Sequence, residues 1–115
     1  MEISARAKQV RVSPRRVRLV LEHLPGKRVE DVLSMLRYMP TPSARHVEKV
    51  VKSAAANAEN NFQLAPGDLR IKAAYADEAP RYKRMRPRAR GRGTSILHRT
   101  SHITVIVEEE EQRGS

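Results

Sequence analysis

Five arginines recur at every second position between residues 84 and 92 of this chain, within the segment RYKRMRPRARGRG. In an extended backbone every second side chain points to the same side, so these guanidinium groups would form one row. A guanidinium group binds two phosphate oxygens at once and stacks on nucleic-acid bases. Residues 79–107 carry eight basic and no acidic side chains. This pattern predicts contact with a large polyanion.

The formal net charge of the 115-residue chain is +10, and this excess is local. Residues 22–78 carry eight basic and eight acidic side chains, whereas residues 1–21 carry six basic and one acidic. A charge-balanced body with two basic zones is typical of a nucleic-acid-binding protein. The side chains that we predict to bind the nucleic acid are Arg6, Lys8, Arg11, Arg15, Arg16, Arg18, Arg81, Lys83, Arg84, Arg86, Arg88, Arg90, Arg92 and Arg99.

Other kinds of chemistry find little support in the sequence. The chain contains no Cys, which excludes disulfides, thiolate zinc sites and thiol nucleophiles. His98 and His102 lie at the entrance of a predicted strand rather than on a helix, which favours hydrogen bonding or phosphate contact over metal binding. No carboxylate pair or Ser-His-Asp arrangement suggests catalysis. We therefore predict no enzymatic activity, no metal and no cofactor.

The sequence also lacks the patterns of membrane insertion and secretion. Its apolar stretches are far shorter than the roughly 20 residues that span a bilayer. The first ten residues, MEISARAKQV, have no apolar core of a signal peptide. We expect a soluble intracellular protein with no membrane partner.

Local patterns predict the elements that must position the basic residues. Ser13-Pro14 and Thr41-Pro42 each combine a capping residue with a proline at the first helical position. Apolar residues then follow at helical spacing, whereas other segments alternate apolar and polar residues. The predicted helices cover 14–24, 29–39 and 42–60, and the predicted strands cover 2–8, 69–76 and 102–108. These elements predict an α+β fold with three helices packed on a small, three-stranded, mostly antiparallel sheet.

The connection between the second and third strands is long, basic and poor in apolar residues, so it cannot form a core of its own. It is either a disordered arm or a protruding β-hairpin that its partner orders. In the hairpin, roughly 12 residues per strand give a reach of roughly 40 Å, with the tip near Ala89 and Arg90. We predict one globular domain over 1–77 and 102–111, an inserted arm over 78–101 and a tail over 112–115.

RNA is the predicted partner. No pair of helices has the helix-turn-helix pattern, and 3% aromatic residues are too few for a base-stacking groove. A rigid basic arm suits a large folded RNA that is recognised by its shape and phosphates. Two alternatives remain, an architectural DNA-binding protein with a basic arm and an enzyme that acts on nucleic acid.

Three blocks of the sequence resemble a known family. They are SPRRVRLV at 13–20, VVKSAAANAENN at 50–61 and RMRPRARGRGTSILHRTSHITVIV at 84–107. Their order and content are similar to the family of bacterial large-subunit ribosomal protein twenty-two, over nearly the whole chain. The acidic run from Glu108 to Glu111 lies outside the shared pattern, and we expect it to face solvent or neighbouring proteins.

The resemblance implies a cytoplasmic, structural constituent of the large (50S) ribosomal subunit that binds 23S rRNA and supports subunit assembly. It also implies that the hairpin tip lines the nascent-peptide exit tunnel beside ribosomal protein four and contacts the nascent peptide transiently. By matching positions, the tip corresponds to Arg88, Ala89, Arg90, Gly91 and Arg92. Tyr82, Lys83 and Arg84 correspond to a stretch that the family associates with macrolide susceptibility.

Overall fold

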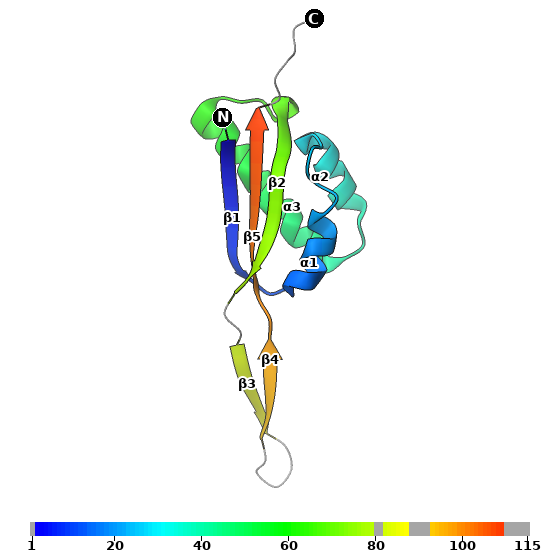
Figure 1. Cartoon of the computed structure of the whole chain (residues 1–115), viewed down its shortest axis with the longest axis vertical. Helices are drawn as coiled ribbons and strands as arrows, with labels where there is room; N and C mark the ends of the chain where they lie inside the picture. The colour runs from blue at the N-terminus through cyan, green and yellow to red at the C-terminus, as the bar shows by residue number, and fades with distance from the viewer. Residues whose placement is uncertain (1, 80–81, 88–92, 110–115) are drawn as a thin grey trace, which may run out of the picture.

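The computed structural model describes residues 2–79, 82–87 and 93–109, and its fold has the predicted α+β class. Figure 1 shows helices beside a sheet, and a second pair of strands that extends beyond one end of this sheet. In chain order the elements are β1 (Glu2–Val10), α1 (Pro14–Leu21), α2 (Val29–Tyr38), α3 (Pro42–Phe62), the short 3-10 helix η1 (Pro66–Asp68), β2 (Leu69–Glu78), β3 (Tyr82–Pro87), β4 (Gly93–His98) and β5 (Ser101–Glu109).

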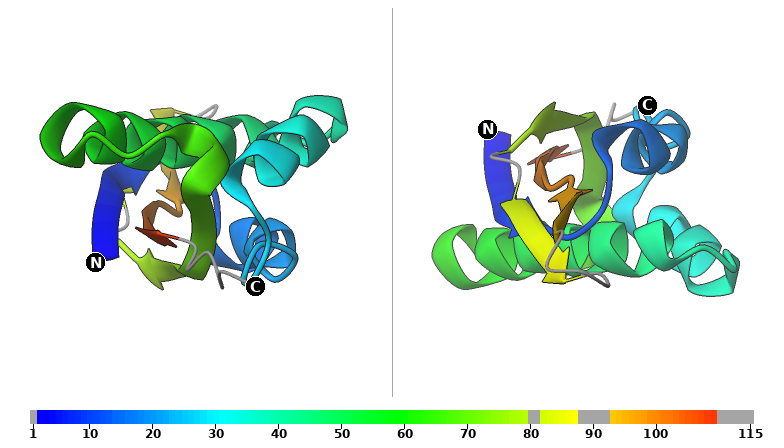
Figure 2. Two further views of the ribbon diagram at one scale, coloured as in Figure 1. Left: turned by 90° about the horizontal axis from the view of Figure 1, so that it is seen from above. Right: turned by 90° about the horizontal axis from the view of Figure 1, so that it is seen from below.

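The three-stranded sheet has β5 at its centre, with β1 and β2 antiparallel to it on either side. Residues of one face, such as Ile3 and Ala5 of β1 and Val105 of β5, are buried. The intervening residues of β1, including Ser4, are exposed, as the alternating sequence predicts. Seen from the ends of the sheet in Figure 2, α3 lies across one face, and α1 and α2 lie beside β2.

Both predicted Ser/Thr-Pro helix starts are confirmed. Ser13 is the N-cap of α1, and its hydroxyl accepts a hydrogen bond from the N–H of Arg16 at 3.4 Å. Thr41 is the N-cap of α3 and has the same extended backbone, but its side chain makes no capping bond. At the other end α3 reaches Phe62, slightly beyond the predicted boundary, and Gln63 ends it with a left-handed φ of 57°.

Alanine is the common residue where α3 meets the sheet. Ala44, Ala54 and Ala58 are fully buried, together with Val47 and Val51. Side chains this small let the helix lie close to β1 and β5, which it contacts directly. The body therefore has a continuous aliphatic core that draws on the helices and on all three strands.

The two remaining strands, β3 and β4, form a separate antiparallel pair that we call the β3–β4 ribbon. The last pair of β2 and β5 before the ribbon is Glu78 with Ser101, and the last pair of the ribbon is Pro87 with Gly93. The predicted tip, 88–92, lies between these last partners in the sequence and is outside the described residues.

The acidic run at the C-terminal end begins inside the sheet. Glu108 and Glu109 belong to β5. The Nε of Arg70, on β2, donates a hydrogen bond to Oε1 of Glu108 at 2.8 Å. Glu108 is therefore part of the sheet rather than of a solvent-facing tail, while Glu110 and Glu111 lie outside the described residues.

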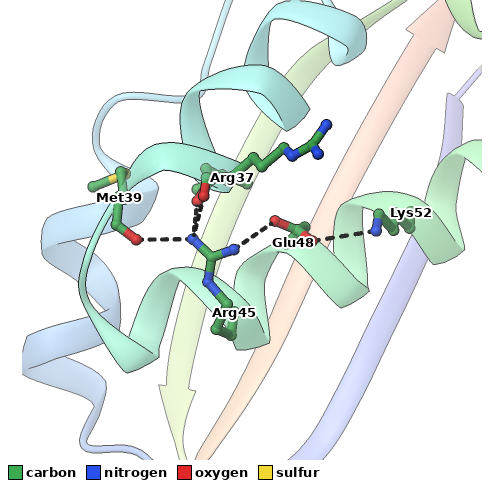
Figure 3. Close-up of polar contacts among 6 residues, drawn as sticks. Arg37, Met39, Arg45, Glu48 and Lys52 are labelled. Atoms are coloured by element: carbon green, nitrogen blue, oxygen red, sulfur yellow. Dashed lines mark hydrogen bonds and ion pairs between the residues drawn. The ribbon is translucent and has the colours of Figure 1, made fainter.

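Arg45 joins the end of α2 to the start of α3 (Figure 3). Its Nη2 donates hydrogen bonds to the carbonyl oxygens of Leu36, of Arg37 at 3.1 Å and of Met39 at 2.8 Å. Its Nη1 donates to Oε2 of Glu48 at 3.2 Å. The carbonyl oxygen of Leu36 also accepts from the N–H of Met39 at 3.3 Å, whereas the last carbonyl groups of a helix generally lack a partner within it, so the guanidinium group supplies donors for those of Arg37 and Met39.

We expect Arg45→Met to lower the free energy of unfolding by about 1–2 kcal/mol, because it keeps the aliphatic stem and removes the donors. Urea denaturation of the whole chain measures this change. Arg37→Met is the matched control, since the Arg37 side chain is exposed in the same turn, and we expect a change below about 0.5 kcal/mol. Equal losses for the two variants would show that the Arg45 side chain does not hold α2 to α3.

Candidate nucleic-acid interface

The body has an open groove of about 980 Å³. The elements that line it include the β4–β5 connection, at the end of the sheet from which the β3–β4 ribbon extends (Figure 1). The groove forms where the β1–α1 connection, α1, the start of α3 and the β4–β5 connection meet. The residues that line it are Arg11, Val12, Ser13, Arg15, Arg16, Leu19, Val20, His23, Met39, Thr41, Pro42, Ser43, His46 and Arg99. We call it the basic groove.

The basic groove brings together four of the predicted basic residues from distant parts of the sequence. Arg11 precedes α1, Arg15 and Arg16 lie in its first turn, and Arg99 lies between β4 and β5. All four are exposed. No lining residue is acidic, so none of these guanidinium groups is neutralised within the groove. Such a surface attracts phosphate groups and can bind them in bidentate fashion.

The starts of two helices also line the basic groove. Ser13 lies at the N-terminus of α1, and Thr41 and Ser43 lie at the N-terminus of α3. The first N–H groups of a helix have no partner within the helix, and the helix dipole adds positive potential there. These termini strengthen the attraction that the four arginines exert on an anion.

Three other predicted basic residues lie elsewhere on the body. The Nε and Nη2 of Arg18 donate hydrogen bonds to the carbonyl oxygen of Ala76 on β2, at 3.1 and 2.8 Å. This side chain therefore holds α1 to the sheet. Arg6 and Lys8 are exposed on β1, on positions that alternate with the buried residues of that strand. None of the three lines the basic groove.

Only some of the predicted basic residues of the arm lie within the described part of the chain. Lys83, Arg84 and Arg86 lie on β3, where Arg84 pairs with Ile96 and Arg86 pairs with Thr94 of β4. Tyr82 is the first residue of the same strand. The residues Arg81, Arg88, Ala89, Arg90, Gly91 and Arg92 lie outside the described residues.

Sequence reasoning did not single out three further residues of the basic groove, which are Leu19, His23 and His46. Leu19 is 60% exposed, unusual for a large apolar side chain. A signal for it was available, because Arg15 and Leu19 are four residues apart and so share one face of a helix. His46 belongs to α3 and meets this face only through the packing of α3 beside α1, which no local pattern reveals.

The described residues contain no other candidate centre of chemistry. Among them, no group of three or more His, Asp or Glu side chains is placed to hold a metal ion. Nor is any helix in the described ranges long and apolar enough to cross a membrane.

A groove lined by four arginines, beside a strand ribbon that carries further arginines, defines a small α+β protein with a strongly basic surface. The chain matches the family model described as "Ribosomal protein L22p/L17e" over residues 5–108. It belongs to this family, which confirms the resemblance of the three sequence blocks.

Individual relatives agree with the family model. The chain is 55% identical over 107 residues to the large ribosomal subunit protein uL22 of Dehalococcoides mccartyi (strain ATCC BAA-2266 / KCTC 15142 / 195), an alignment that covers 93% of this chain and 98% of the relative. It is 52% identical over 109 residues to the protein of the same name from Clostridium novyi (strain NT), covering 95% and 98%. The similarity therefore extends over both the body and the arm.

Proposed function

We propose that this chain is a structural, non-enzymatic protein of the large ribosomal subunit and that it binds 23S rRNA through the basic groove and the arm. The observation that carries the proposal is the groove, where Arg11, Arg15, Arg16 and Arg99 surround a space with no acidic residue. A folded rRNA presents closely spaced phosphates, which suit several guanidinium groups on a rigid body. The names of the relatives support the large subunit as the location, which in bacteria is cytoplasmic.

The arm, residues 78–101, extends from the body and makes further contacts deeper within the rRNA. Arg99 of the basic groove directly follows β4, so an rRNA segment bound in the groove lies next to the β3–β4 ribbon, which extends from the same end of the sheet (Figure 1). The tip at 88–92 lines the nascent-peptide exit tunnel beside ribosomal protein four and touches the nascent peptide transiently. Membership of the family and the position of the ribbon beyond the sheet support this assignment.

The body and the arm have separate tasks in subunit assembly. The body, residues 1–77 and 102–111, folds around its own core, and the arm joins rRNA segments that are distant from one another; residues 112–115 form a tail. The core supports this division, since every described residue of the aliphatic cluster lies outside the arm. Because groove and arm bind different stretches of rRNA, one copy of the chain brings these stretches together early in assembly.

Deletion of residues 82–84 is expected to change macrolide susceptibility while the large subunit still assembles. The deletion removes three of the residues of β3 that pair with β4. An odd change of register moves every remaining side chain of a strand to the opposite face, so the arm changes shape near its tip. Growth at a series of macrolide concentrations, in cells whose ribosomes carry only the variant, measures the effect. Unchanged susceptibility with intact subunits would count against a tip in the tunnel.

Sedimentation of the tagged whole chain from a cell extract tests whether the chain is part of the large ribosomal subunit. It should co-sediment with large ribosomal subunits and leave them only at high salt, because its contacts are with phosphates. A chain that sediments with DNA instead, or that stays at the top of the gradient at low salt, would favour the alternative of an architectural DNA-binding protein.

A further inference from the structure

The two outer strands of the sheet differ in how their free edges are covered. On β2, the N–H of Gly26 donates to the carbonyl oxygen of Ile71, and the N–H of Ile71 donates to that of Lys27, each at 2.8 Å. The carbonyl oxygen of Ala76 further along β2 accepts from Arg18. In contrast, β1 is the last strand on its side, and no described strand pairs with its outer edge. From Glu2 to Ala7 the pairing with β5 is regular, and in an antiparallel pair only alternate residues bond to the neighbour, so the other residues of this stretch direct their N–H and C=O groups away from β5. Beyond it the register shifts, and the N–H of Gln9 donates to Nδ1 of His102 at 3.1 Å.

A second groove, of about 150 Å³, follows this edge between β1 and α3. Figure 2 shows α3 crossing over β1 and continuing past it, so the helix overhangs the edge. Small apolar residues, Ala5, Ala7 and Val10 of β1 and Val50 of α3, form half of its lining, and the other half is polar or basic: Arg6, His46, Lys49 and Ser53. We call it the edge groove; its volume suits small apolar side chains.

The edge groove has a basic rim. Arg6 on β1 and His46 and Lys49 on α3 line it, and Lys8 is the next exposed residue on β1. Arg6, Lys8 and Lys49 form no ion pair with another described residue, whereas Lys52, one turn further along α3, is paired with Glu48 at 3.2 Å. The rim is therefore complementary to a partner that brings negative charge.

We propose that an extended acidic peptide segment of a neighbouring protein binds along β1 as a fourth strand of the sheet. Main-chain hydrogen bonds to the outer edge of β1 supply affinity, as in other cases of strand addition. Alternate side chains of the segment enter the edge groove below α3 and are small and apolar. The intervening side chains lie beside Arg6 and Lys8 and are acidic.

A nucleic acid suits this surface less well than a peptide does. Ala5, Ala7, Val10 and Val50 offer a phosphate no hydrogen-bond donor, whereas the other lining residues could bind either a phosphate or a carboxylate, so the free edge of β1 decides between the two partners. A strand edge pairs with another peptide backbone and not with a sugar–phosphate chain. The inference is independent of rRNA binding, because the edge groove and the basic groove share only His46.

The test titrates the whole chain with a capped eight-residue peptide in which Glu and Val alternate, followed by amide NMR. Saturable shifts are expected for residues 2–10 and 46–53, with slowed hydrogen exchange at alternate residues of β1 only. A peptide with the same composition, four Glu followed by four Val, is the control and should cause no saturable shift. Equal binding of both peptides, or uniform slowing along β1, would overturn strand addition.

Matched variants test the basic rim. Arg6→Gln is expected to weaken binding of the alternating peptide by about two- to fivefold, whereas Lys52→Gln, the loss of one charge on α3 outside the groove, should leave it unchanged. An equal effect of both variants would show that the basic rim does not interact with the charge of the peptide.

A titration of the whole chain with oligouridylate tests whether a nucleic acid binds this surface instead. Saturable shifts at residues 2–10 with the oligonucleotide, and none with the peptide, would contradict the proposal.

Discussion

Replacing residues 80–99 by an Asn-Gly turn is expected to lower the affinity for 23S rRNA by about 100-fold or more at moderate salt, while the body stays folded. The removed segment carries eight basic side chains and no acidic one. Each phosphate contact releases counterions, and six to eight lost contacts amount to several orders of magnitude in affinity between low and moderate salt. This is the largest effect that the account predicts for any change that leaves the core intact.

The Asn-Gly turn can join the two cut ends of the body because residues 79 and 100 already lie side by side. Glu78 pairs with Ser101, and the N–H of Ala79 donates to the carbonyl oxygen of Thr100 at 3.1 Å. A two-residue Asn-Gly turn joins antiparallel strands at this separation with the correct twist. We therefore expect the free energy of unfolding to change by less than about 1 kcal/mol, as for a surface change.

Two measurements on the same variant separate binding from folding. Filter binding to 23S rRNA measures affinity, and urea denaturation measures stability. Unchanged affinity would show that the arm does not bind rRNA. A variant that fails to fold would show that the body depends on the arm, contrary to the separate core that we assign to it.

The second large effect is expected from the basic groove. The triple variant Arg11→Gln, Arg15→Gln and Arg16→Gln should bind 23S rRNA about 10- to 100-fold more weakly than the original chain, because three phosphate contacts are lost. The fold should persist, because these side chains are exposed and the N–H of Arg16 still bonds to Ser13. Arg99 is left in place, which keeps this variant distinct from the removal of the arm.

A control variant with the same loss of charge shows whether position matters. Lys27→Gln, Arg37→Gln and Lys52→Gln remove three exposed cations that do not line the basic groove. We expect a decrease below about threefold, because distant surface charges are largely screened at physiological ionic strength. Equal weakening by both triple variants would mean that only the net charge of the chain matters.

The sequence predicted the elements well because their signals are local. Ser13-Pro14 and Thr41-Pro42 start helices through the residues' own hydrogen bonds and dihedral angles, so no distant partner is needed. Alternation likewise identified β1 and β2, since a strand with one buried face must alternate, and the β-branched residues of 102–108 identified β5. The α+β class followed from the order of these elements.

Features that depend on two distant segments were not predictable in the same way. The sequence predicts Arg18 as an RNA-binding residue but gives no sign that it also donates to Ala76, which is on the strand beside α1. Arg45 was not singled out, because its carbonyl partners at the end of α2 become neighbours only through the α2–α3 turn. The sequence thus identifies candidate basic residues, and the packing of the elements determines what else each of these side chains contacts.

The candidate site was predicted in composition but not in shape. Arg11, Arg15, Arg16 and Arg99 were all identified as basic contacts, but nothing in the sequence placed Arg99 beside the other three. Their meeting requires that β5 lie between β1 and β2, which brings the β4–β5 connection next to the start of α1. The groove is thus a consequence of strand order.

The salt dependence of 23S rRNA binding tests the central claim most directly. The logarithm of the binding constant is measured against the logarithm of salt concentration for the original chain, the groove triple variant and its control. Since each phosphate contact contributes about 0.7–0.9 to the slope, the groove variant should lose about 2–3 in slope, and the control should lose less than about 1. A groove variant that keeps the full slope of the original chain would show that Arg11, Arg15 and Arg16 do not contact rRNA phosphates.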